Sequence, residues 1–193
     1  MDTLDVPGKV NARCLDYLLM EMVSTSISIS HQKGDPVEIP DPTRTINILD
    51  QNFINSDDVT LRNENYGFQV GIRLSELLLH KAPASSPKIS NILDIMKFVC
   101  RDVWRCLYGK QMDNLRTNHR GIFVLVDNNC RLISSMNSAK GVPDSIARAR
   151  TFLWFPCGLI RGILQSFGIE ALVTAEITSF PAVTFNIQTS INN

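Results

Sequence analysis

Apolar residues recur at spacings of three and four along the first half of the chain, a pattern that predicts amphipathic helices. One helix is predicted over 11–29 and a second over 61–81. The clearest helix is predicted over 88–108, where apolar side chains fill about half of the helical wheel. A helix this apolar needs two neighbours. We therefore expect it to contact the domain core on one side, and another helix or another subunit on the other.

Pairs of glycines stand four residues apart in two of the predicted helices. Gly67 and Gly71 lie in the second helix, and Gly158 and Gly162 lie in a fourth helix predicted over 143–167. This spacing places both members of a pair on one face, where the missing side chains let another backbone approach closely.

The pattern changes to period two in the remaining segments, which predicts strands. Three short strands are expected over 112–117, 121–126 and 130–136. A closing hairpin is expected from 169–177 and 183–188. The strand 121–126 is apolar on both faces, so it should be central in the sheet or covered twice.

The predicted order is three helices, a three-strand meander, one long helix and a hairpin. This order indicates an α+β fold with four main helices on one side of an antiparallel sheet. Pro156 should kink or split the fourth helix. We expect 1–10 to be a flexible N-terminus and 11–190 a single domain. The polar, proline-containing stretch 31–60 should be a flexible insertion within that domain.

Charge and cysteine usage narrow the class of protein. The chain has 193 residues, with 19 Lys and Arg against 19 Asp and Glu. This balance lacks the basic footprint of a nucleic-acid binder or of a polybasic membrane anchor. The five cysteines form no CxxC pair, which argues against structural zinc. The start shows no secretory signal, so we expect a reduced, cytoplasmic protein.

Candidate chemistry is sparse. His119 with Cys130 or Cys157 would supply the residue types of a cysteine hydrolase, but Cys157 falls on the apolar side of its helix. A buried structural thiol is the favoured interpretation of that cysteine. The sequence contains neither GxxxxGK[ST] nor GxGxxG. We predict no catalytic residue, metal or cofactor, and hence no enzyme.

Three stretches carry a family resemblance: ENYGFQVGIRLSE (64–76), ILDIMKFVCRDVWRCLYGKQMDNLRTNHRGIFVLVDN (92–128) and CGLIRGILQSFGIEALVTAEITSFPAVTFNIQ (157–188). They resemble the sixth-subunit family of the transport protein particle, TRAPP, which includes a thirty-three-kilodalton subunit and is related in fold to the third subunit. The resemblance implies a non-catalytic core subunit of a vesicle-tethering complex. The resemblance implies that the complex acts between endoplasmic reticulum and Golgi and within the Golgi. It also implies that the chain associates with the cis-Golgi and endoplasmic reticulum peripherally, through the complex.

The family also implies partners. The whole complex promotes nucleotide exchange on an early-secretory Rab GTPase, and the sixth subunit forms a heterodimer with TRAPP subunit 3, mainly through the first two helices. Other TRAPP subunits are further partners. The resemblance assigns the dimer surface to apolar residues of those helices: Leu15, Leu18, Leu19, Met22, Phe68, Ile72 and Leu79.

Two alternatives stay open at this point. The chain could form a homodimer when its partner is absent. It could also be a small-molecule or lipid-binding module that uses an internal cavity of the same fold. The third subunit carries an acylated cysteine, but no cysteine here matches that motif, so the resemblance does not extend to acylation.

Overall fold

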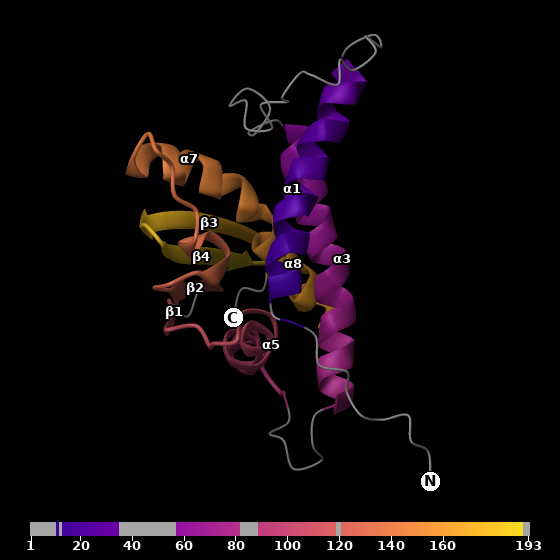
Figure 1. Cartoon of the computed structure of the whole chain (residues 1–193). Coiled ribbons are helices and arrows are strands. Elements are labelled where there is room, and N and C mark those ends of the chain that lie inside the picture. Colours follow the sequence, from indigo (N-terminus) through magenta and orange to yellow (C-terminus); the bar gives the residue numbers. More distant parts are fainter. Residues whose placement is uncertain (1–10, 12, 35–56, 82–88, 119–120, 191–193) are drawn as a thin grey trace.

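A computed structural model of the chain describes residues 11, 13–34, 57–81, 89–118 and 121–190. The predicted flexible N-terminus, His119 and the middle of the predicted insertion lie outside the described residues. The described part is an α+β fold, as predicted, with helices packed on a four-stranded antiparallel sheet. In Figure 1 the sheet lies to the left, and two long helices run side by side along the right.

These two long helices are α1 (Arg13–Gly34) and α3 (Asp57–Lys81). The start of α1 is supported by Asn11, whose side-chain oxygen accepts the backbone N–H of Arg13 at 3.0 Å. Residues 31–34 and 57–60 are helical, so the predicted insertion over 31–60 was too wide at both ends. Asp57 and Asp58 occupy the first turn of α3, where carboxylates interact favourably with the helix dipole.

The third predicted helix is a continuous rod of three parts: α4 (Ile92–Phe98), the π-helical η1 (Val99–Val103) and α5 (Trp104–Tyr108). It begins after Asn91, whose side chain accepts the N–H of Asp94. The π segment carries more residues per turn, so a uniform wheel misplaces the residues beyond it. Cys106, which a uniform wheel places on the apolar half of this helix, is exposed. Phe98, which the sequence places among charged residues, is buried against Phe167 with ring centroids 6.2 Å apart.

The strand predicted over 130–136 was wrong. After β1 (Asn114–Thr117) and β2 (Ile122–Asp127), the chain forms a short helix, α6 (Arg131–Ser134). The sheet order is β1-β2-β4-β3, so β1 and β4 occupy both edges of β2 and no place remains for a third consecutive strand. This order confirms that the doubly apolar strand is central.

The fourth predicted helix is split, as its proline suggested. Leu153 separates helix α7 (Val142–Phe152) from α8 (Trp154–Ser166), which carries Pro156 in its first turn. Proline is tolerated there because a first-turn N–H has no partner within its own helix. The chain closes with β3 (Ala171–Ser179) and β4 (Ala182–Thr189), close to the predicted hairpin.

The core lies between the sheet and the helices. Phe123 and Leu125 of β2 are buried, and their neighbours on β4, Ile187 and Phe185, are buried with them. The fully buried indole of Trp104 packs on Phe185 with ring centroids 5.4 Å apart. Helix α8 is buried along most of its length, so it forms the central helix between the sheet and α3.

Candidate partner interface

Helix α3 is held against α8 by the two glycine pairs. Gly67 and Gly71 of α3 face α8, and Gly158 and Gly162 of α8 face α3. A methyl group added at any of the four would overlap a backbone carbonyl oxygen of the other helix, those of Phe155, Leu159, Glu64 and Phe68 respectively. The helices therefore pack backbone to backbone.

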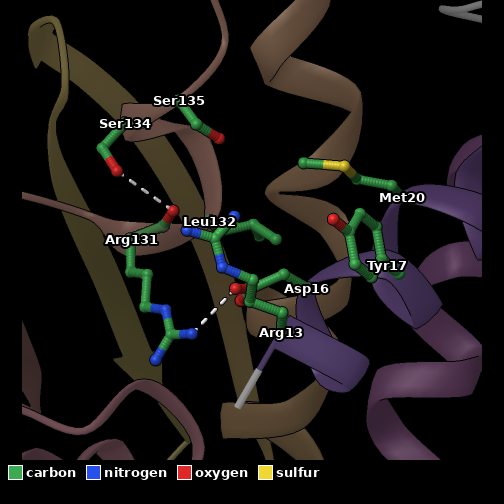
Figure 2. Close-up of a pocket in the computed structure, with 8 residues that line it drawn as sticks. All are labelled: Arg13, Asp16, Tyr17, Met20, Arg131, Leu132, Ser134 and Ser135. Atoms are coloured by element: carbon green, nitrogen blue, oxygen red, sulfur yellow. Dashed lines mark hydrogen bonds and ion pairs between the residues drawn. The ribbon is translucent and has the colours of Figure 1, made fainter. Parts of the chain in front are cut away.

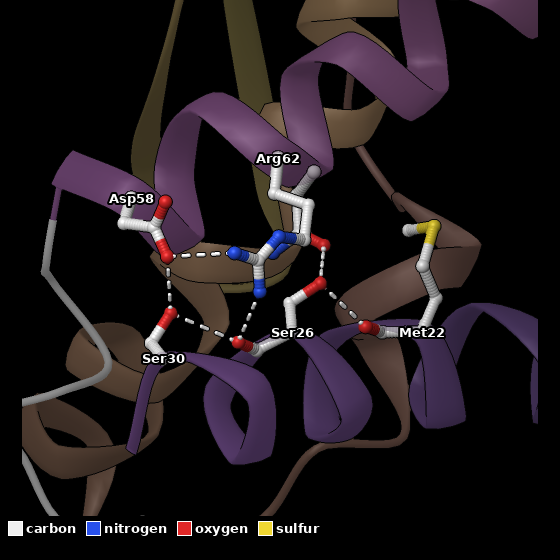
Figure 3. Close-up of polar contacts among 6 residues, drawn as sticks. Met22, Ser26, Ser30, Asp58 and Arg62 are labelled. Carbon is white, nitrogen blue, oxygen red and sulfur yellow. Dashed lines mark hydrogen bonds and ion pairs between the residues drawn. The ribbon is translucent and has the colours of Figure 1, made fainter. Parts of the chain in front are cut away.

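Helix α1 is fixed on α3 by a small polar network (Figure 3). Ser30 Oγ donates to Asp58 at 2.7 Å, and Arg62 donates to the same carboxylate at 2.7 Å. Arg62 also donates to the main-chain oxygen of Ser26 at 3.0 Å, and Ser26 Oγ lies 2.9 Å from the side-chain oxygen of the fully buried Asn63. These contacts show that the helices run antiparallel and set their register.

The Ser26 hydroxyl lies within reach of two acceptors, the side-chain oxygen of Asn63 and the main-chain oxygen of Met22. Ser26 Oγ carries one proton and also lies 2.8 Å from Met22 O, while Asn63 Nδ2 has no acceptor. Exchange of the Asn63 amide oxygen and nitrogen would satisfy all three groups. Asn63 would then donate to Ser26, and Ser26 to Met22.

The exposed apolar side chains of α3 follow two lines. At about 100° per residue, Tyr66, Val70 and Leu77 share the flank of Val59 and Asn63, which contact α1. With Leu18 of α1 we call them the α1-side stripe. The antiparallel register pairs 26 with 63, which places Leu18 level with Val70. These side chains are 64% (Leu18), 49% (Leu77), 41% (Val70) and 40% (Tyr66) exposed.

A second line lies on the opposite flank of α3, beside α8. We call it the α8-side stripe, formed by Leu61, Phe68, Ile72 and Leu79. Its middle is partly covered, because the Arg161 guanidinium lies 4.6 Å from the centre of the Phe68 ring. Arg161 is held there by Glu64, with 2.9 Å between Nε and the carboxylate.

The structure separates the seven residues predicted for the dimer surface. Leu18 and Leu79 are exposed, on the α1-side and α8-side stripes respectively, and Phe68 and Ile72 are half-buried on the α8-side stripe. Leu19 is 4% exposed and belongs to this chain's own core. Leu15 and Met22 pack partly against that core. The seven therefore do not form one patch.

Sequence reasoning missed Tyr66, Val70 and Leu77 as surface residues. A signal was present in the glycines. Once Gly67 and Gly71 are assigned to a helix contact, the flank of α3 that carries Tyr66 and Val70 is set about 100° away from it. A periodicity argument alone finds an apolar face, but it does not say which neighbour covers that face.

The described residues offer little for catalysis. Cys130 and Cys157 are each 1% exposed, and burial raises the pKa of Cys130 to about 12 and also raises that of Cys157. A thiol held protonated is a poor nucleophile. Within the described ranges, no three His, Cys, Asp or Glu side chains are grouped to hold a metal ion. Of the helices described, none is long and apolar enough to cross a membrane.

The sheet, its helices and the uncovered stripes define a small α+β domain with an apolar helix surface. A family described as transport protein particle (TRAPP) component matches residues 15–190, and the chain belongs to this family. The resemblance found in the sequence is confirmed.

Similar proteins agree with this assignment. Trafficking protein particle complex subunit 6B of Bos taurus is 44% identical over 124 residues, covering 64% of this chain and 74% of the relative. An uncharacterized protein of Schizosaccharomyces pombe is 34% identical over 188 residues, covering 97% of this chain and 67% of the relative.

A solved structure shares the fold. A trafficking protein particle complex subunit 3 from Naegleria fowleri, covalently bound to palmitic acid, superposes with a TM-score of 0.64 at 12% identity. The match covers 94% of this chain and 98% of the other.

Proposed function

We propose that this chain is a non-catalytic core subunit of a TRAPP vesicle-tethering complex and pairs with subunit 3 through the α1-side stripe. In this role it supports the nucleotide exchange that the whole complex performs on a Rab GTPase in endoplasmic reticulum-to-Golgi and Golgi traffic. The chain is cytoplasmic and reaches membranes peripherally, through the complex. The observation that carries the proposal is the exposed α1-side stripe, in a family whose members are named as complex subunits.

The α1-side stripe suits a lasting contact better than the α8-side stripe does. Contiguous exposed apolar side chains on a soluble domain mark interaction surfaces. Tyr66, Val70 and Leu77 lie within roughly 17 Å along α3, and Leu18 extends the surface onto a second helix. On the α8-side stripe, Leu61 and Leu79 are separated by about 27 Å, and Arg161 covers the ring between them.

The test is co-purification with a subunit 3 homologue after Leu18→Asp or Val70→Asp. Both side chains are exposed in the isolated chain, so either variant should fold normally. In the heterodimer the new carboxylate would be buried without a partner, at a cost of several kcal/mol. We expect the dissociation constant to rise by at least about 100-fold. The measurement is titration calorimetry, or size-exclusion chromatography of the mixture.

The matched control is Leu172→Asp, because Leu172 is 61% exposed on the edge strand β3, away from both stripes. It should leave pairing unchanged. Leu79→Asp tests the other flank of α3 and should also leave it unchanged. If Leu79→Asp abolishes pairing while Leu18→Asp does not, the pairing surface is the α8-side stripe, and the assignment of pairing to the α1-side stripe is wrong.

The alternative is a small-molecule or lipid-binding module. The observation in its favour is the shared fold with the palmitate-bound subunit 3 structure. Intact mass measurement of the chain purified from its own cells decides the matter. A stoichiometric mass increment, or a ligand retained in native mass spectrometry, would favour the alternative.

A further inference from the structure

A pocket of about 310 Å³ lies between α1 and α6 (Figure 2). Helix α1 contributes Arg13, Asp16, Tyr17 and Met20, and α6 with the residue after it contributes Arg131, Leu132, Ser134 and Ser135. The Arg13 side chain extends from α1 toward α6, between the two walls. Segments about 115 residues apart in sequence are thus joined around a cluster of charged groups.

The two arginines of this pocket differ in their partners. Arg131 Nη2 pairs with Asp16 Oδ2 at 2.7 Å, and both side chains are one-third exposed. Among the residues that the structure describes, Arg13 forms no ion pair, so its guanidinium is available to a ligand. The Ser135 hydroxyl and the Tyr17 ring, which is 64% exposed, complete the rim with Met20.

We propose that this pocket receives the carboxylate of an Asp or Glu in an acidic segment of another protein of the assembly, with Arg13 as the main contact. A guanidinium binds a carboxylate through two parallel hydrogen bonds. The single positive charge of Arg13 matches a single carboxylate, whereas a phosphate dianion would also be repelled by Asp16. Tyr17, Met20 and Leu132 give the hydrocarbon part of a peptide an apolar contact.

This second surface is separate from the α1-side stripe. Tyr17 and Met20 lie roughly 100° or more around the α1 axis from Leu18. One protein on the stripe and another in the pocket can therefore contact α1 together. The inference rests on family membership in an assembly and not on the α1-side stripe, so either proposal can fail alone.

The test uses the full chain in the assembled complex, with Tyr17 replaced by the photo-reactive residue p-benzoylphenylalanine. Mass spectrometry after irradiation should identify a cross-link to a segment rich in Asp and Glu. Arg13→Glu should reduce that cross-link by at least about tenfold, because two carboxylates would then meet. The variant should fold, since an acidic residue in the first turn of α1 favours the helix dipole.

Two further variants separate recognition from a structural role. Arg116→Glu makes the same charge change on the edge strand β1 and should leave the cross-link intact. Asp16→Asn removes the opposing carboxylate and should strengthen the cross-link, an effect that mere disturbance of the pocket would not produce. Replacing the cross-linked Asp or Glu of the partner protein by Lys should restore the cross-link in Arg13→Glu.

Three results would overturn the proposal. They are the absence of any protein cross-link, a cross-link insensitive to Arg13→Glu, and a cross-linked segment without acidic residues. Inorganic phosphate is the competing probe. If phosphate abolishes the cross-link at an ionic strength where chloride and acetate do not, the pocket is a phosphate site and the carboxylate assignment is wrong.

Discussion

Asp127 illustrates how far a single residue can depart from its sequence pattern. Asp127 and the two asparagines after it form a sequence typical of an exposed turn. The Asp127 side chain is nevertheless fully buried, at the end of β2. Its carboxylate accepts the indole N–H of Trp104 at 2.8 Å and lies 2.5 Å from Lys110 Nζ. Burial alone would lower the pKa of Lys110. The hydrogen bond and charge of Asp127, together with Asp113, outweigh burial and raise it.

We expect Asp127→Ala to lower the free energy of unfolding by roughly 3 kcal/mol, because it leaves the buried indole N–H of Trp104 without its acceptor and leaves Lys110 with only the longer contact to Asp113. Asp127→Asn keeps an acceptor oxygen and should cost less. The comparison is Asp102→Ala, which removes an exposed ion pair with Arg101 and should cost less than about 1 kcal/mol. Urea unfolding with unchanged m-values measures the differences, and equal midpoints for the Asp127 and Asp102 variants would contradict the assignment.

At the scale of elements, periodicity identified the long helices and the closing hairpin because each buries one regular face. It failed where tertiary contacts override the local pattern. Nothing in the local pattern of 99–103 indicates a π turn, so the exposure of Cys106 could not be predicted. The alternation at 130–136 did not form a strand because β4 takes the free edge of β2. Tyr66, Val70 and Leu77 were missed as surface residues for a related reason, since a helical wheel shows an apolar face but not which neighbour covers it.

The glycine pairs make the sharpest element-scale prediction, because two effects oppose each other. Alanine is the better helix former by about 1 kcal/mol, so Gly158→Ala would stabilise an isolated helix. In the fold, the added methyl would overlap the carbonyl oxygen of Glu64, and backbone cannot rotate away as a side chain can. We expect the steric clash to outweigh the gain in helix propensity, with a net loss of about 1–3 kcal/mol in the free energy of unfolding.

The control for this pair is Gln69→Ala, on the exposed part of the same helix as Gly67 and Gly71. It gains some helix propensity without a clash, so thermal stability should stay level or rise slightly. A stabilised Gly158→Ala would show that α3 and α8 are not in backbone contact.

At the scale of the whole molecule, the uncovered stripe and the charge balance act together. A formal net charge of zero gives little repulsion between copies of the chain. The α1-side stripe lies on two antiparallel helices, so two copies can meet it through a two-fold axis. We predict that the isolated chain self-associates weakly through this stripe, and that a subunit 3 homologue displaces the second copy.

Sedimentation velocity over a range of concentrations measures this association. The chain should shift from monomer toward dimer as concentration rises, Leu18→Asp should stay monomeric, and Leu172→Asp should behave like the parent chain. Added salt should leave the apolar association intact while weakening any contact made through Arg13, because screening acts on exposed charges. A strictly monomeric parent chain would contradict self-association. Dimers that persist in Leu18→Asp would place self-association on another surface. Either result would leave the stripe to the heterodimer alone.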